Sequence, residues 1–197
     1  MAGTKSSRDE YVRYVDEQRR RKDRFFSTSP QSPIPYVERR AFAGLAYYPP
    51  DPEYRVTAEV ALFPDAEVLR MATSTGEIRP QARYAELRFT LDDRQYRLFG
   101  FTEPHDHHVH ELFVPFRDAT SGRETYGAGR YLEVELHQPH QGAETVTIDF
   151  NLAYNPFCAY SPDYSCPIPP PENTLPVVIT AGERAYLASH SHHHSHT

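Results

Sequence analysis

Apolar and polar residues alternate with a period of two along the middle of the chain. The clearest run lies at 54–62, where apolar side chains occupy every second position. Such alternation predicts a strand with one buried face. Two further runs flank Asp92 and Asp93, and turn residues between alternating segments predict a tight β-hairpin. We predict the remaining strands at 67–74, 111–115, 130–136, 145–151 and 175–180.

The order of these strands predicts the fold class. They follow one another with turn residues between them, and no helical pattern alternates with them. That order favours antiparallel pairing over a βαβ architecture. The predicted fold is therefore mainly β, an antiparallel sandwich or partly open β-barrel with an N-terminal α-helix.

The N-terminal segment has the period of a helix instead. Ser7 and Glu10 have the spacing of a capping box, and apolar residues then recur at helical intervals, which predicts a helix over 7–26. An isolated helix of this length is marginal in water, so its apolar face should pack on the sheet. That face consists of Tyr11, Tyr14, Val15 and Phe25.

One folded domain accounts for most of the chain. A helical arm at 1–26 is expected to precede a single β domain at 27–188. Residues 189–197 have no apolar side chain that could anchor them, which predicts a disordered His-rich tail.

Composition narrows the possible partners. With 39% hydrophobic and 13% aromatic residues, the 197-residue chain can build a core. A net charge of −6 argues against nucleic acid, whose phosphates require a surplus of Lys and Arg. The chain has no apolar run for a membrane span and no secretory signal at its N-terminus, so we expect no membrane partner and a cytoplasmic location. The expected partner is a small molecule, and self-association stays open.

The segment at 149–177, called here the Pro-rich loop, carries the densest set of reactive and amide side chains. A loop this long inside a compact domain is usually functional, and its prolines would hold polar side chains in place at little further entropic cost. Its candidate ligand-binding residues are Asp149, Asn151, Asn155, Cys158, Cys166 and Asn173.

The two cysteines of the loop allow three interpretations. Seven residues separate Cys158 from Cys166, a spacing that matches neither a zinc ribbon nor a C-x-x-C redox site. They can be structural thiols or a local disulfide, ligands of a metal completed from elsewhere, or a reactive thiol pair. We expect the structural role, with slow labelling of both thiols in the folded protein.

Two further stretches are candidates for chemistry. Residues 105–110 contain four histidines and an aspartate, which form either a metal site on one strand face or a solvated polar loop. Residues 115–132, called here the Gly/Arg hairpin, contribute Arg117, Asp118, Tyr126 and Arg130 as candidate ligand-binding residues. Its arginines can reach an anion or form an Arg–carboxylate network that pins the hairpin to the barrel.

Several long motifs resemble a known family. PFRDATSGRETYGAGRYL at 115–132 and DFNLAYNPFCAYSPDYSCPIPPPENTLPVVITAGE at 149–183 are similar to the bacterial and archaeal family of domain of unknown function 1684, as are KDRFF and YYPPDPEYRV. The resemblance implies no established reaction, cofactor or catalytic residue. The His-rich stretch lies outside the resembling pattern. We therefore group the two motifs and predict that they meet in space and line one cleft.

These observations favour a binding module over an enzyme. We expect a small β-barrel or sandwich whose Gly/Arg hairpin and Pro-rich loop enclose a polar or anionic small molecule. A metal-assisted hydrolase or a thiol-dependent enzyme is the alternative, so whether the chain is an enzyme stays open. An interaction protein that docks through its N-terminal helix is a third class with less support.

Overall fold

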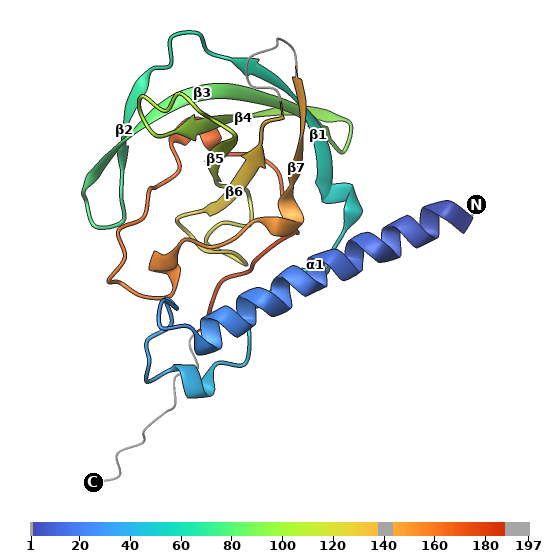
Figure 1. The fold of residues 1–197 in the computed structure, drawn as a ribbon, viewed down its shortest axis with the longest axis vertical. Coiled ribbons are helices and arrows are strands. Elements are labelled where there is room, and N and C mark those ends of the chain that lie inside the picture. Colours follow the sequence, from blue (N-terminus) through green and yellow to red (C-terminus); the bar gives the residue numbers. More distant parts are fainter. Residues whose placement is uncertain (1, 138–143, 188–197) are drawn as a thin grey trace.

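The computed structural model describes residues 2–137 and 144–187, and its main feature is a strongly curved antiparallel sheet (Figure 1). Its strands are β1 (Arg55–Leu62), β2 (Val68–Ala72), β3 (Ile78–Leu91), β4 (Arg94–Thr102), β5 (Glu111–Phe116), β6 (Arg130–Glu135) and β7 (Glu144–Asp149). The sheet order is β6-β5-β4-β3-β1-β7, with β2 paired to the first half of β3. The end strands β6 and β7 contact each other. The sheet is thus a nearly closed barrel, which confirms the predicted mainly β fold with an N-terminal helix.

The predicted hairpin forms at Asp92 and Asp93. Leu91 pairs with Arg94, and the two aspartates between them have φ of 49° and 60°. Two consecutive residues in the left-handed region form the turn whose twist matches that of paired strands, and Asp tolerates this conformation. β3 continues well before the predicted hairpin because β2 pairs along its first half.

The predicted strand at 175–180 is wrong. Among the described residues, these positions form no strand, although they run beside the end of β5 through a bridge between Arg117 and Thr174. Pro176 has no backbone N–H, so this stretch cannot form a continuous ladder.

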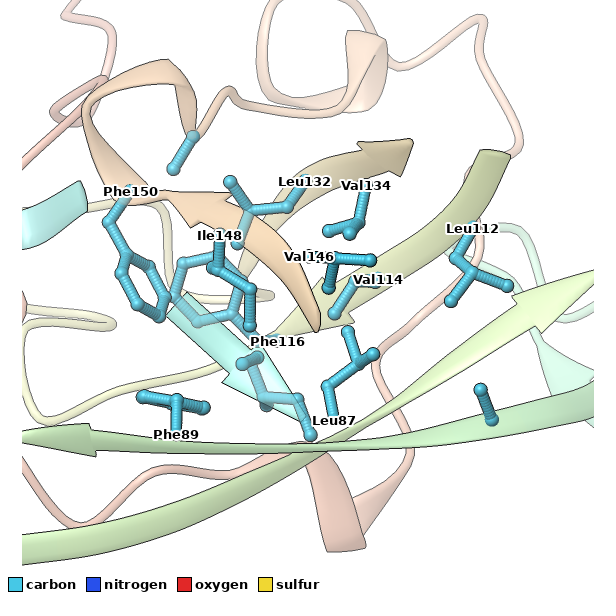
Figure 2. Close-up of a cluster of buried hydrophobic side chains, with 14 of the residues drawn as sticks. Leu87, Phe89, Leu112, Val114, Phe116, Leu132, Val134, Val146, Ile148 and Phe150 are labelled. Carbon is cyan, nitrogen blue, oxygen red and sulfur yellow. The ribbon is translucent and has the colours of Figure 1, made fainter. Parts of the chain in front are cut away.

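The interior of the barrel is a single apolar cluster. Alternate residues of each strand point inward, so that Leu87, Val114 and Ile148 from three separate strands meet there (Figure 2). Phe150 follows β7 and packs edge-on against Phe116, with ring centroids 5.5 Å apart. This packed interior leaves the outward strand faces and the loops as the places for a site.

Helix α1 (Ala2–Thr28) runs along one end of the barrel, and its first turns project beyond the barrel (Figure 1). It begins before the predicted start, so Ser7 lies inside the helix and caps nothing. Val15 and Phe26 are its buried apolar residues, whereas Tyr14 is 51% exposed. No helix in the described ranges is long and apolar enough to cross a bilayer.

The partners of α1 also differ from those expected. The predicted face included Phe25, but Phe25 is 37% exposed, and Phe26 instead packs edge-on against Tyr160 of the Pro-rich loop at a centroid distance of 5.0 Å. The helix therefore docks on loops rather than on the face of the sheet. The predicted disordered tail at 189–197 lies outside the described residues.

Candidate functional site

The Gly/Arg hairpin and the Pro-rich loop meet at the end of β5. The amide of Arg117 donates to the carbonyl of Asn173 at 2.9 Å, and the amide of Leu175 donates to the carbonyl of Arg117 at 2.8 Å. The prediction that these two motifs meet in space is thus confirmed. That they line one cleft and that they bind a ligand both stay predictions, and the geometry of each side chain shows what else it does.

Arg130 is fully buried, and its guanidinium binds groups inside the protein. It donates to the carbonyls of Ala181, Glu183 at 3.1 Å and Ile179 at 3.0 Å, and it lies 3.4 Å from the buried carboxylate of Asp118. Asp118 in turn accepts from the amide of Ile179 at 2.7 Å. Of the two roles left open for these arginines, Arg130 has the second, an Arg–carboxylate network that pins the hairpin.

Asn173 joins two strands that diverge. β4 and β5 are paired at Phe101 and Phe113, and beyond this point the buried amide of Asn173 lies between them. Its Oδ1 accepts from the amide of Phe99 at 2.8 Å, while its Nδ2 donates to the carbonyls of Phe99 at 2.9 Å and Pro115 at 2.8 Å. These bonds also fix the position of the residues that follow Asn173.

The first polar side chains of the Pro-rich loop bind neighbouring segments. Both carboxylate oxygens of Asp149 accept from the Tyr11 hydroxyl of α1 at 2.8 Å. The side chain of Asn151 bonds both backbone groups of Asp51, at 2.8 and 2.7 Å. Asn155 donates to a backbone carbonyl at 2.9 Å, and its buried Oδ1 has no partner among the described residues. All three side chains thus tie the Pro-rich loop to other segments of the chain.

Glu183 is a buried carboxylate that the sequence analysis missed. Lys22 of α1 forms an ion pair with it, the amide of Asn155 donates to it at 2.8 Å, and the hydroxyl of Tyr160 donates at 2.7 Å. Burial, and then the charge of Glu183, raise the pKa of Tyr160, so this hydroxyl stays protonated and keeps donating. The cluster attaches α1 to the loops of the barrel.

Cys158 and Cys166 lie side by side as free thiols. Cys158, in a short 3₁₀ turn at Phe157–Ala159, is partly exposed, and Cys166 is buried. The amide of Cys158 donates to the Cys166 sulfur at 3.3 Å, and the hydroxyl of Tyr126 lies 3.6 Å from the Cys158 sulfur. Hydrogen bonds from the Cys166 thiol and the Tyr126 hydroxyl lower the pKa of Cys158 to about 6. The same thiol–thiol bond raises the pKa of Cys166.

The His-rich stretch lies in the exposed connection between β4 and β5. Asp106 accepts from the amide of His108 at 2.8 Å, a bond internal to the loop. Within residues 2–137 and 144–187, no three His, Cys, Asp or Glu side chains are grouped so that they could hold a metal ion. The stretch therefore supplies no assembled set of ligands.

A groove of about 950 Å³ lies on the outside of the barrel, and we call it the outer groove. Its floor is the outward face of β1, β3, β4 and β7, and Glu172, Thr174, Leu175 and Pro176 of the Pro-rich loop line it as well. Threonines are frequent in the lining, at Thr57, Thr90, Thr145 and Thr174. The charged lining residues are Glu59, Glu86, Arg88, Arg97 and Glu172.

The charges of the outer groove are only partly paired with one another. Glu86 accepts from Arg88 at 2.5 Å and lies 3.9 Å from Arg97, and both arginine side chains are 63% exposed. Glu172 is paired with Arg83 at 2.5 Å. Since a guanidinium has five N–H donors, Arg88 and Arg97 keep donors for a further partner.

The family model described as "Protein of unknown function (DUF1684)" matches residues 40–184. The chain belongs to this family. A search of curated proteins finds no match.

A solved structure is similar to this DUF1684 chain over nearly all of its length. It is the solution NMR structure of an uncharacterised protein of Haloarcula marismortui, with 43% identity and a TM-score of 0.71. The match covers 91% of this chain and 96% of that one.

In the structure of this DUF1684 chain, the predicted site residues do not form the single group that the sequence analysis expected. The structure joins Arg130 to Asp118 and Tyr126 to Cys158, but it places Asp149 beside α1 and Asn151 beside Asp51. The residues on the floor of the outer groove were not selected as candidate site residues in the sequence analysis, because they are the polar, outward-facing positions of strands in which apolar and polar residues alternate. That pattern alone is also typical of a solvent-facing surface.

Proposed function

We propose that this DUF1684 domain binds a small polar molecule in the outer groove. The observation that carries the proposal is the pair of exposed guanidiniums, Arg88 and Arg97, beside a wall held in place by Asn173. The volume of about 950 Å³ falls within the range of small-molecule sites. A cytoplasmic location and self-association stay predictions.

The lining favours a ligand that carries both an anionic group and hydrogen-bond donors. A carboxylate or phosphate is the group that arginines bind best, because the planar guanidinium matches two oxygens at once. Glu59 and Glu172 provide acceptors in the same groove, suited to an amine or hydroxyl. With three carboxylates against two arginines, a zwitterion fits this lining better than a polyanion.

The rigid position of the wall supports the same proposal. Asn173 is fully buried and bonded to backbone groups of both β4 and β5, so Thr174 and Leu175 are held beside the groove. A site that is formed before its ligand arrives loses less entropy on binding. The Pro-rich loop thus contributes a wall to the groove, and Asn173 supports that wall from behind.

The first prediction is that a zwitterionic ligand stabilises the protein through the two arginines. Thermal unfolding would be followed with a panel of amino acids, simple carboxylates and sugar phosphates. A ligand present at about 100 times its Kd adds about 2.7 kcal/mol of stability. For a domain of this size, that corresponds to a Tm rise of roughly 5–10 °C.

Variants of the groove residues test whether such a rise in Tm comes from binding in the outer groove. Arg88→Gln with Arg97→Gln should abolish the rise, and the exposed β2 variant Arg70→Gln should retain it. If none of the panel raises Tm, or if the double variant responds like the wild type, the outer groove is not the binding site. Thiol-dependent chemistry, the alternative expected from the sequence, has support at a separate place, the Cys158–Cys166 pair.

A further inference from the structure

Cys158, Cys166 and Tyr126 form a cluster of polar groups that lies outside the lining of the outer groove. Cys158 and Tyr126 come from different segments, yet sulfur and hydroxyl lie 3.6 Å apart. Cys166 lies against the turn between β2 and β3, where its amide donates to the Ser74 hydroxyl at 3.1 Å and its carbonyl accepts from the Ser74 amide at 2.9 Å. Cys158 is thus partly exposed, whereas Cys166 is buried and bonded to the turn.

We propose that Cys158 and Cys166 are a thiol–disulfide exchange site for small-molecule disulfides. Cys158 is the attacking thiol, Cys166 the resolving thiol, and Tyr126 the residue that positions the attacking sulfur.

Accessibility and protonation both select Cys158 as the attacking group. It is the more exposed of the two, and the thiolate is the form of cysteine that attacks a disulfide. With a pKa of about 6, Cys158 is mostly ionised at neutral pH. An ordinary cysteine, with a pKa of about 8.5, has roughly thirty-fold less thiolate at pH 7. The hydrogen bonds from Cys166 and Tyr126 that stabilise this charge also hold the sulfur in place.

The exchange is balanced in atoms and electrons. The Cys158 thiolate attacks one sulfur of a disulfide R–S–S–R, forms a mixed disulfide and expels R–S⁻. Cys166 then loses its proton to the expelled thiolate, attacks the Cys158 sulfur and releases the second R–S⁻, which takes a proton from water. Since Cys158 enters as a thiolate whose proton is already in solution, the net result is one protein disulfide and two small thiols. The protein sulfurs are oxidised, and the small disulfide is reduced.

When Cys158 loses its negative charge in the first attack, the second attack, by Cys166, becomes easier. The pKa of Cys166 is raised chiefly by its hydrogen bond to Cys158, and the charge of Cys158 adds to this effect. Once Cys158 is part of a mixed disulfide, it carries no charge, and Cys166 loses its proton more easily. The Cys166 sulfur already lies 3.3 Å from the Cys158 amide nitrogen, so the attack takes place between residues that are in contact before the reaction begins.

The second prediction tests this sequence on the full chain. Reduced protein would be mixed with oxidised glutathione, and mass spectrometry would follow the products over time. The wild type should end with an internal disulfide and no bound glutathione. Cys166→Ser should stop at a single glutathione adduct on Cys158, and Cys158→Ser should react at least about ten-fold more slowly, since its remaining thiol is buried.

The pH profile separates a positioning role of Tyr126 from a merely structural one. The rate of labelling of wild-type Cys158 should be half-maximal near pH 6. In Tyr126→Phe this midpoint should move to higher pH, whereas Tyr164→Phe, the same change at a tyrosine of the Pro-rich loop, should leave it in place. Circular dichroism would verify that each variant is folded.

Three outcomes would overturn the proposal. These are a lasting glutathione adduct on the wild type, equal rates in Cys158→Ser and the wild type, and thiols that react only after the protein is unfolded. The last outcome is the slow labelling expected from the sequence for purely structural cysteines. None of these measurements depends on a ligand in the outer groove.

Discussion

Replacing Arg130 with Met is expected to lower the free energy of unfolding by about 3–5 kcal/mol, the usual cost of removing one partner of a buried ion pair. Both Arg130 and Asp118 have fully buried side chains. The variant would leave the Asp118 carboxylate buried without its cation. It would also leave the carbonyls of Ile179 and Ala181 without their donors.

Urea unfolding followed by circular dichroism would measure this loss, and an unchanged slope would show that the unfolding transition is otherwise the same. The control is Arg123→Met, which removes an exposed arginine of the same hairpin and should change stability by less than about 0.5 kcal/mol. A loss below about 1 kcal/mol for Arg130→Met would mean that the hairpin is held by its backbone bonds instead.

The sequence predicted the strands well because period-two alternation and turn residues act locally. The hairpin at Asp92 and Asp93 is an example, since both its left-handed residues and its flanking alternation are visible in the sequence. The segment at 175–180 shows the limit of this approach. Leu175 and Ile179 are buried by the barrel, while the backbone of the segment bonds mostly to the Gly/Arg hairpin, a partner about 60 residues away in the chain.

The spacing of apolar residues correctly predicted the N-terminal helix, but the residues with which the helix packs differ from those expected. Helical spacing located α1, but spacing cannot distinguish Phe25 from Phe26, which are adjacent and differ only by a rotation about the helix axis. The choice depends on where Tyr160 and Glu183 lie, and both come from the other end of the chain. The tertiary partners thus decide which face is buried.

The candidate site was predictable as a set of residues and not as a function. Asn173 and Arg130 look like ligand-binding residues because amide and guanidinium groups bind ligands well, but the same groups bind backbone equally well. Which of the two they do depends on unpaired backbone groups nearby, such as those of Phe99 where β4 and β5 diverge. The Tyr126–Cys158 contact likewise depends on two segments that meet only in the folded chain.

Replacing Lys22 with Met is expected to lower the free energy of unfolding by about 3 kcal/mol, the lower end of the range for breaking a buried ion pair. Glu183 has a side chain only 2% exposed, whereas Lys22 is 26% exposed, so water can partly compensate. The remaining donors to the carboxylate, Asn155 and Tyr160, carry no charge. Urea unfolding would measure the loss.

A double-mutant cycle separates the charge from the packing of the lysine side chain, which also lies over the Phe26 and Tyr154 rings. Adding Glu183→Gln removes the unpaired charge, so the double variant should recover part of the loss.

Limited trypsin digestion provides a second readout, because cleavage in the basic run at 19–24 requires α1 to leave the barrel. Lys22→Met should be cut faster there than the wild type, and Lys5→Met, a change in the projecting first turns, should not. If Lys22→Met unfolds and is cut like the wild type, Glu183 does not hold the helix, and α1 is an arm that a partner can displace.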